Sequence, residues 1–354
     1  MYGPHLIQGS SFEAMALSVT IKDVARAAKV SVATVSRALN GHDNVTEAVR
    51  SRVLAVAHEL RYSPHHAARS LSSRRTHTIG VALPDLHGEF FSELVRGIDH
   101  VARDRGLHLL VSSYHGHPEE QASALRAMRG RVDGLLVMSP HVGNIDFLSE
   151  NLAALPAVLI NSQPTESQHV AFGIDNYGGA RTMMRHLLTA GHRRIAFIAG
   201  PPNNFDAFER LRGYRDALLE ADPTAVPWVL PGDFSEASGH SAGQQLLDSE
   251  DFPDAVFAAN DMMALGCLFA LNHGGLRVPD RIALAGFDDI PIARYVAPSL
   301  TTMRVNIPEL GAHAMRLLLD LQNGEDVAAR LAPMVPELIL RESSRSPGAP
   351  DGDP

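Results

Sequence analysis

The chain has 354 residues, of which 45% are hydrophobic and 20% charged, and its formal net charge at pH 7 is −9. This length and apolar content predict a globular, soluble protein of two or three domains. No apolar run approaches the length of a membrane span, and residues 1–18 lack a basic stretch followed by an apolar core, so we expect no membrane contact, no signal peptide and a cytoplasmic protein. The single cysteine, Cys267, excludes an internal disulfide and a cysteine-based metal cluster, and its apolar neighbours predict a core position.

Two short helices are predicted near the N-terminus, after a patternless stretch over 1–18 that we expect to be disordered. The first helix has Thr20 as its N-cap. Its apolar residues recur at i, i+3, i+4 and i+7 and are Ile21, Val24, Ala25 and Ala28. Lys29 and Val30 break this run, and Ser31 can cap a second helix. The buried side of that second helix would consist of Val35, Ala38 and Leu39.

The second helix would end at Asn40 and Gly41 and leave its other face free. That face carries Ser31, Val32, Ala33, Thr34 and Arg37. Two helices in this arrangement form a helix-turn-helix, in which the second helix enters the major groove of DNA. Arg37 could then pair with guanine, whereas Val32 and Ala33 can make only apolar contacts such as those to thymine methyl groups. The alternative is that both helices simply pack within an all-helical subdomain.

A third helix and the charge distribution agree with a DNA-binding head. Thr46 can cap this helix. Its apolar side would be formed by Val49, Val53, Ala57 and Leu60. Residues 1–75 contain ten Lys or Arg and five Asp or Glu, whereas the remaining residues contain 21 and 35. A basic head on an acidic body is typical of a nucleic-acid-binding domain fused to another unit, because phosphate neutralisation supplies most non-specific affinity for DNA. A solvated charged surface is the alternative interpretation.

A short polar and basic segment follows, in which Ser63 and Pro64 provide an N-cap and a first helical position for a helix that reaches Leu71. Isolated helices below about 12 residues rarely persist in water, so we expect this one to be ordered only when something holds it. After a connector that ends near residue 76, the pattern changes. Apolar strands then alternate with helices, which predicts βαβ units around parallel sheets. The expected strands cover 78–83, 107–111, 132–138, 194–199, 226–230, 255–258 and 282–285, and the expected helices lie near 90–105, 118–129, 176–190, 206–220, 235–249 and 260–273.

Several stretches resemble the LacI/GalR (lactose repressor/galactose repressor) family of bacterial transcription regulators. The N-terminal sequence TIKDVARAAKVSVATVSRALNG is similar to the family's helix-turn-helix almost position for position, and the segment from Tyr62 to Leu71 is similar to its hinge helix. Similar phrases continue through the rest, among them IGVALPDLHGEFFSELVRGID, ERLRGYRDAL, FAANDMMALG and ALAGFDDIPIARYVAPSLTTM. The resemblance covers about residues 20–340. It implies an α/β fold with a three-helix DNA-binding domain, a hinge helix and a two-lobed core like that of periplasmic binding proteins.

The resemblance also implies which residues contact DNA. They are Thr20, Ser31, Val32, Ala33, Thr34, Arg37, Asn40, Tyr62, Ala68 and Leu71. Two hinge helices of a dimer would lie together in the minor groove, with Leu71 wedged between the central base pairs of the operator. Such a wedge costs unstacking energy, which the bend and the added contacts offset. The alternative is a linker helix whose Leu71 packs on its own domain.

The family's effector cleft lies between the two lobes, where parallel α/β sheets bind ligands beyond the carboxyl ends of their strands. Matching residues here are Asp85, Phe90, Phe91, Asn161, Arg210, Phe234, Asn260 and Asp288. Aromatic faces can stack on a sugar ring or a purine, and Arg, Asp and Asn can pair with vicinal hydroxyl groups. Alternatively, Asp85 or Asn260 could cap the following helix, and one of the two phenylalanines could be a core residue, since we expect only one of an adjacent pair to face the cleft.

Some features depart from the family pattern. Val32 and Ala33 cannot hydrogen-bond a base, so Arg37 and the shape of the DNA would carry more of the recognition. Asn161 stands where many sugar-binding relatives have an acid. The tail from Ser343 shows no heptad repeat, which predicts a homodimer without a tetramerising coiled coil.

Two features of the sequence are compatible with other classes of function. The sequence Gly239-His-Ser-Ala-Gly243 matches the nucleophile elbow of serine hydrolases, but it lies within a helical pattern with no strand directly before it. His115 and His117 lack further spaced ligands for a metal. A stand-alone sugar-binding protein would suit the two lobes but not the DNA-binding head. We therefore expect neither enzymatic activity nor a cofactor or metal.

The combined prediction is a cytoplasmic bacterial transcription regulator, most simply a repressor. Its partners would be a roughly palindromic operator, a small-molecule effector of the carbohydrate type and a second copy of the chain. We expect a disordered extension over 1–18, a DNA-binding domain over 19–62, a hinge and linker over 63–76, an effector-binding and dimerisation core over 77–342 and a disordered tail over 343–354.

The hinge hypothesis predicts the effect of truncating Leu71. Leu71→Ala should weaken operator binding, because the wedge that holds the bent operator is lost. The affinity of the DNA-free protein for its effector should stay the same. Operator titrations by fluorescence anisotropy test this prediction, and an unchanged operator affinity would contradict it.

Overall fold

The computed structural model describes residues 19–39, 44–62, 75–140, 152, 155–162 and 169–344. The chain divides into two compact units, Met1–Thr76 and His77–Pro354. The expected disordered extension over 1–18, Asn40, and the hinge helix with Ala68 and Leu71 lie outside the described residues. Among the residues that are described, no helix is both long and apolar enough to cross a membrane.

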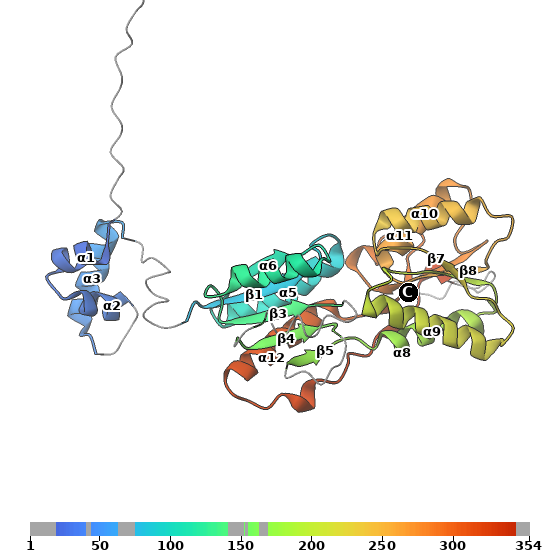
Figure 1. The fold of residues 1–354 in the computed structure, drawn as a ribbon. Coiled ribbons are helices and arrows are strands. Elements are labelled where there is room, and N and C mark those ends of the chain that lie inside the picture. The colour runs from blue at the N-terminus through green and yellow to red at the C-terminus, as the bar shows by residue number, and fades with distance from the viewer. Residues whose placement is uncertain are drawn as a thin grey trace, which may run out of the picture. The chain divides into compact units, whose positions relative to one another are not determined.

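The N-terminal unit consists of three helices, α1 (Ile21–Ala28), α2 (Val32–Leu39) and α3 (Glu47–Glu59) (Figure 1). The first two helices begin as predicted. The backbone N–H and the hydroxyl of Thr20 donate to the carboxylate of Asp23, and the N–H of Thr34 donates to Ser31 Oγ at 3.1 Å. Thr46 occupies the N-cap of α3, but its side chain makes no cap hydrogen bond.

A small core fixes these helices against one another. Its fully buried valines are Val24, Val35 and Val53, one from each helix, and small alanines fill the space around them. This packing leaves the opposite face of α2 uncovered, so the side chain of Val32 is 41% exposed and Ala33 and Arg37 are exposed beside it. The predicted helix-turn-helix is confirmed in its local geometry.

The second unit contains two lobes. Lobe 1 is built on a parallel sheet with strand order β2-β1-β3-β4-β5. Its strands are β1 (Thr78–Leu83), β2 (His108–Ser113), β3 (Gly134–Met138), β4 (Ala157–Ile160) and β5 (Val170–Phe172). Its helices are α5 (Glu89–Asp104), α6 (Pro118–Met128) and α12 (Ile307–Gln322). Alternate β1 residues face opposite sides, so that Ile79 and Val81 pack in the cluster with α5 and α12, while Ala82 packs toward α6.

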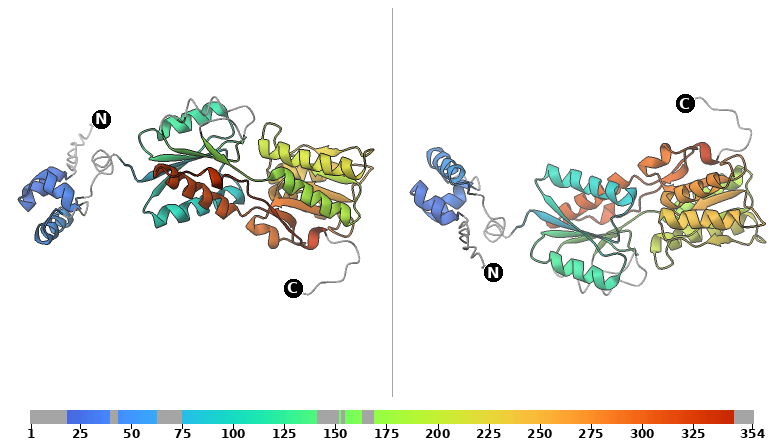
Figure 2. Two further views of the ribbon diagram at one scale, coloured as in Figure 1. Left: turned by 90° about the horizontal axis from the view of Figure 1, so that it is seen from below. Right: turned by 90° about the horizontal axis from the view of Figure 1, so that it is seen from above.

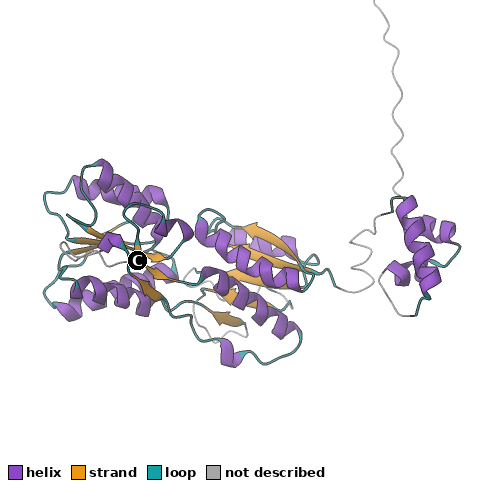
Figure 3. Cartoon of the chain, turned by 180° about the vertical axis from the view of Figure 1, so that it is seen from behind, coloured by secondary structure: helices purple, strands orange, loops and turns teal. Residues whose placement is uncertain are grey.

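Lobe 2 is built on a six-stranded sheet with order β11-β10-β9-β8-β6-β7, in which only β11 runs antiparallel, to β10. Its strands are β6 (Ile195–Ile198), β7 (Trp228–Leu230), β8 (Ala255–Ala258), β9 (Ala283–Asp288), β10 (Thr301–Arg304) and β11 (Glu337–Ile339). Its helices are α8 (Asn176–Thr189), α9 (Phe205–Ala221), α10 (Glu236–Leu247) and α11 (Asp261–His273). The pair α8 and α9 covers one face of the sheet, and the pair α10 and α11 covers the other (Figure 2). In each lobe the strands lie between layers of helices (Figure 3).

The chain crosses between the lobes three times. It passes from β5 to α8, returns from β10 to α12, and passes again from the 3-10 turn Ala328–Arg330 to β11. The first and third crossings lie side by side, because Ile174 and Met334 form a parallel bridge. The sequence pattern had placed two lobes in series and had not predicted that α12 returns to lobe 1, where it packs against α5.

Most predicted elements are confirmed within two or three residues, but some were missed. The missed elements are β4, β5, β10, β11 and α12. The predicted end of the core at residue 342 is also wrong, because Ser343 and Ser344 are buried. Ser343 Oγ donates to the carbonyl of Leu284, and Ser344 Oγ lies 2.8 Å from the hydroxyl of Thr301. These bonds fix the end of the described chain to lobe 2.

Helices α10 and α11 approach closely because glycines meet at their contact. A Cβ atom added at Gly266 would lie 1.9 Å from the carbonyl oxygen of Glu236, and one at Gly239 would lie 2.0 Å from the carbonyl oxygen of Met263. Cys267, next to this contact, is fully buried as predicted, and burial raises the pKa of its thiol to about 12. The packing of the two helices therefore sets the position of the first turn of α10.

This contact predicts that Gly266→Ala destabilises the core. The new methyl group would clash with backbone rather than with a flexible side chain, so we expect a loss of about 1–3 kcal/mol in the free energy of unfolding. Ser241→Ala, on the exposed side of α10, should change it by less than about 0.5 kcal/mol. Urea unfolding followed by circular dichroism measures both, and equal stabilities of the two variants would contradict the packing.

Candidate functional site

A cleft of about 520 Å³ lies between the two lobes. Its walls come from the loops that follow β1, β2 and β3 in lobe 1 and β6, β7, β8 and β9 in lobe 2. These are carboxyl ends of parallel strands, where ligands of such sheets bind. Seven of the eight predicted effector residues line it, namely Asp85, Phe90, Phe91, Arg210, Phe234, Asn260 and Asp288.

The eighth residue, Asn161, does not line the cleft. It follows β4 with a positive φ of 49° and is 2% exposed. Its Nδ2 donates to Asp206 Oδ2 at 3.0 Å. Asp206, in the first turn of α9, does line the cleft and had not been predicted. Asn161 therefore contacts a residue of the cleft wall without lining the cleft itself. Because Asn161 belongs to lobe 1 and Asp206 to lobe 2, this hydrogen bond joins the two lobes.

Both phenylalanines after β1 line the cleft, so the expectation that only one would do so is wrong. The rings of Phe90 and Phe91 meet edge to face, with centroids 5.5 Å apart and planes at 82°. Both residues are partly buried in the first turn of α5, where the helix begins at the rim of the lobe. Neighbouring side chains on one turn can therefore share a single wall.

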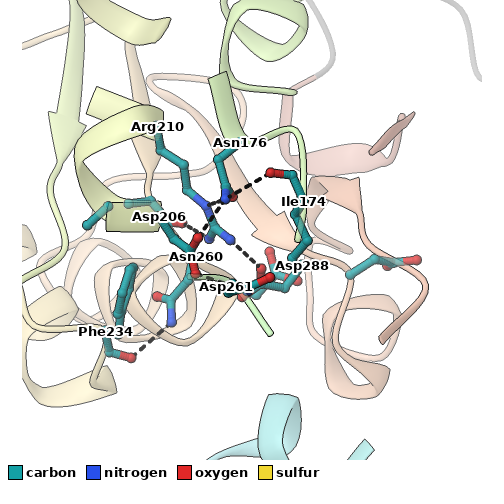
Figure 4. Close-up of polar contacts among 12 residues, drawn as sticks. Ile174, Asn176, Asp206, Arg210, Phe234, Asn260, Asp261 and Asp288 are labelled. Carbon is teal, nitrogen blue, oxygen red and sulfur yellow. Dashed lines mark hydrogen bonds and ion pairs between the residues drawn. The ribbon is translucent and has the colours of Figure 1, made fainter. Parts of the chain in front are cut away.

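Arg210 forms the centre of the lobe 2 wall (Figure 4). Its Nε donates to Asn176 Oδ1 at 2.8 Å, and its Nη1 donates to the carbonyl of Ala259 at 2.6 Å. Its Nη2 lies 3.2 Å from Asp288 Oδ1 in an ion pair that is almost completely buried. The guanidinium also stacks on the ring of Phe287, 3.8 Å from its centroid. All three guanidinium nitrogens are thus held by partners on α8, the end of β8 and β9, while the side chain itself comes from α9.

Two buried carboxyl groups share this guanidinium. Asp206 accepts from Asn161 and also from Asn176, whose Nδ2 lies 2.8 Å from Asp206 Oδ1 (Figure 4). Burial raises the pKa of Asp206 to about 6, and burial likewise raises the pKa of Asp288 to about 6, although Arg210 opposes both shifts. Asp261 lies close by, accepts from Thr302 and from the N–H of Ile290, and burial raises its pKa well above the usual range. The wall therefore carries more buried carboxyl groups than cations.

The loops after β7 and β8 are bonded to each other. Asn260 caps α11 by accepting from the N–H of Met263 at 3.0 Å, and its Nδ2 donates to the carbonyl of Phe234 at 3.0 Å. Asn260 therefore caps α11 and also lines the cleft. Phe234 adopts a positive φ of 73°, which turns its carbonyl toward Asn260. Asp233 holds the same loop from the other side by accepting from the N–H and the hydroxyl of Ser235.

Asp85 does not cap the following helix, because its Oδ1 accepts from the N–H groups of Leu86 and His87 and closes a turn.

Three histidines of the cleft were missed or treated as surface residues, namely His87, His115 and His117. His115 and His117 follow the carboxyl end of β2. Because ligands of parallel sheets bind beyond the carboxyl ends of the strands, the position of these two histidines in the sequence could have indicated that they line the cleft. Within the described part of the chain, no group of three His, Cys, Asp or Glu side chains could hold a metal ion.

The nucleophile-elbow motif lies inside α10, where Ser241 is exposed on the middle of the helix. A hydrolase elbow needs a sharp turn between a strand and a helix, so the motif has the wrong geometry.

The predicted DNA contacts of the N-terminal unit lie mostly at its surface. Exposed are Thr20, Ser31, Val32, Ala33 and Arg37, and Thr34 is partly exposed. Tyr62 packs against the small core.

The raised pKa of Asp206 predicts a pH dependence of stability. The folded protein binds more protons than the unfolded chain between about pH 4 and pH 6, so this group's contribution to the free energy of unfolding falls as the pH rises through that window. Asp206→Asn should remove up to about 3 kcal/mol of that fall. Urea unfolding across the pH range tests the difference from wild type, with exposed Asp248→Asn as the control. Equal pH slopes for wild type and Asp206→Asn would contradict the assignment.

Family models match both units of the chain. Residues 20–65 match the bacterial regulatory proteins of the lacI family, and residues 184–344 match a periplasmic binding protein-like domain. Catabolite control protein A of Priestia megaterium is 33% identical over 332 residues, which cover 93% of this chain and 100% of that protein. The HTH-type transcriptional repressor CytR of Escherichia coli K12 is 37% identical over 331 residues, which cover 93% of this chain and 97% of that protein.

Solved structures agree with these relatives. The lac repressor dimer bound to operator and the anti-inducer ONPF has a TM-score of 0.83 and 30% identity, over 93% of this chain and 100% of that chain. The complex of the transcriptional regulator CelR with cellobiose has a TM-score of 0.67 and 33% identity, over 92% of this chain and 99% of that chain. With a helix-turn-helix, a two-lobed core and relatives that align over nearly their full length, the chain belongs to the lacI family of DNA-binding bacterial transcription regulators.

Proposed function

We propose that the protein is a repressor that binds a roughly palindromic operator as a homodimer in the bacterial cytoplasm. An uncharged polyhydroxyl compound, most simply a sugar, is its effector and binds in the cleft between the lobes. The observation that carries the effector class is the wall around Arg210, where aromatic rings adjoin a dense set of carboxyl and amide groups.

On the DNA side, the uncovered face of α2 supports the proposal. Arg37 is the exposed cation of that face, and bidentate pairing of an arginine with guanine is the commonest specific contact in the major groove. Val32 and Ala33 offer apolar contacts only, so the base pairs opposite them would be recognised through thymine methyl groups or through DNA shape. Asn40, Ala68 and Leu71 belong to the same proposed interface.

On the effector side, charge favours a neutral ligand. Asp85, Asp206, Asp233 and Asp288 line the cleft, and Arg210 already engages three protein groups. A phosphate group would meet this excess of carboxyl groups, whereas hydroxyl groups can donate to carboxylates and accept from amides. Two solved relatives hold carbohydrates, namely CelR with cellobiose and a LacI family regulator from Enterococcus faecium with ribose.

A nucleoside is the second candidate effector. Phe90, Phe91 and Phe234 provide aromatic faces on both walls, and an aromatic face suits a base as well as a sugar ring. The sugar is favoured because acceptor-rich carboxyl groups outnumber aromatic rings in the cleft.

The crossings between the lobes suggest how the cleft would control DNA binding. Any change in the angle between the lobes must be absorbed at the three crossings, and it would displace the start of β1, which follows the segment 63–76, relative to lobe 2. We attribute regulation to this displacement, which would stabilise or melt the hinge helices of the dimer. Such coupling through order and disorder is an established route of allostery.

Thermal stability across a panel of sugars, sugar phosphates and nucleosides tests the effector class. A ligand that binds only the folded state stabilises it by about 2.7 kcal/mol at 100 times its dissociation constant. We expect neutral sugars to raise the melting temperature of wild type and of the surface variant Asp280→Asn, but not of Asp288→Asn. Stabilisation by phosphorylated compounds alone would contradict the proposed class.

A further inference from the structure

The two walls of the cleft touch each other through the side chains of a histidine and a glutamate. His87, in the loop after β1, places its Nε2 3.2 and 3.3 Å from the two carboxylate oxygens of Glu236, in the first turn of α10. One residue belongs to lobe 1 and the other to lobe 2, so the contact spans the cleft. The side chains remain 68% and 44% exposed, which places the pair at the solvent-facing edge.

Both ends of the pair are rigidly held. On the lobe 1 side, the turn closed by Asp85 fixes the backbone of His87 through a 3.0 Å hydrogen bond to its N–H. On the lobe 2 side, Ser235 caps α10 and is itself bonded to Asp233, which fixes the first turn that carries Glu236. The loops that hold the pair are thus the same loops that form the walls of the cleft.

Besides the bond between Asn161 and Asp206, two contacts between the lobes involve backbone N–H groups. The N–H of Ile292 in lobe 2 donates to Glu89 Oε2 in lobe 1 at 2.9 Å. The N–H of Phe205 in lobe 2 donates to the carbonyl of Pro140 in lobe 1 at 2.7 Å. Each of these amides is protected from solvent exchange only while the lobes stay together, so both report on closure.

We propose that His87 and Glu236 form a latch that holds the two lobes together across the cleft and shifts the balance between open and closed lobes toward the closed arrangement. The contact is a hydrogen bond when the imidazole is neutral and an ion pair when it is protonated. Because the pair is exposed, its loss should shift the balance between closed and open lobes only about two- to fivefold. A contact of this strength can be broken during each opening event, which suits a gate better than a permanent clamp.

A role of the latch in effector exchange rests on the proposed function, because an effector must pass between the latched walls. The latch itself does not rest on it. Its test therefore uses the full-length protein without DNA and without any effector, so that failure of the effector hypothesis leaves the result interpretable.

Hydrogen–deuterium exchange resolved to the amides of Phe205 and Ile292 tests the latch. His87→Ala and Glu236→Gln should each speed exchange at both amides about two- to fivefold, while the amide of Val256, in the middle of β8 and away from the cleft, keeps its wild-type rate. The double variant should show no more than the effect of one single variant, because both substitutions remove the same contact.

Two further variants make the test specific. Glu220→Gln removes an exposed ion pair with Arg181 that lies entirely within lobe 2, and it should leave the exchange of both reporter amides unchanged. The swap His87→Glu with Glu236→His should restore protection. Unchanged exchange in His87→Ala and Glu236→Gln would overturn the latch, and so would acceleration in Glu220→Gln or a swap that fails to restore protection.

Discussion

A single buried guanidinium organises the effector cleft. Arg210 neutralises Asp288, stacks on Phe287 and bonds to Asn176 and to the end of β8, so that one side chain ties four elements of lobe 2 together. Without Arg210, ionised Asp206 and Asp288 would be buried with no cation near them. An unpaired buried charge destabilises the folded state strongly, because its desolvation is not offset. The cost that remains is visible in the raised pKa values of both carboxyl groups.

The same network extends across the lobes, and this extension links the site to regulation. Asp206 is held from lobe 2 by Asn176 and from lobe 1 by Asn161, so a ligand that engages Asp206 competes for a bond that holds the lobes together. The close packing of α10 on α11 through Gly239 and Gly266 fixes the far wall. A ligand in the cleft can thus change the angle between the two lobes without changing the internal packing of either lobe.

The sequence predicted much of this arrangement, and the failures have physical causes. Long periodic segments such as α5 and α9 were identified because their apolar faces are continuous, whereas three-residue strands such as β5 and β11 are too short to show a pattern. Family resemblance indicated Arg210 and Asp288 correctly as cleft residues. It could not show that Asn161 acts through Asp206, or that His87 reaches Glu236, because both facts depend on how separate lobes meet.

Occupancy of the cleft and binding of the operator should be coupled if the effector acts on the angle between the lobes. The operator dissociation constant of the full-length protein would be measured without a ligand and with a saturating concentration of the sugar that stabilises it most. We expect a change of about 5- to 150-fold, and by thermodynamic linkage the operator must change the affinity for the sugar by the same factor. An operator dissociation constant that stays the same at saturating sugar would show that the cleft and the DNA-binding unit are not coupled.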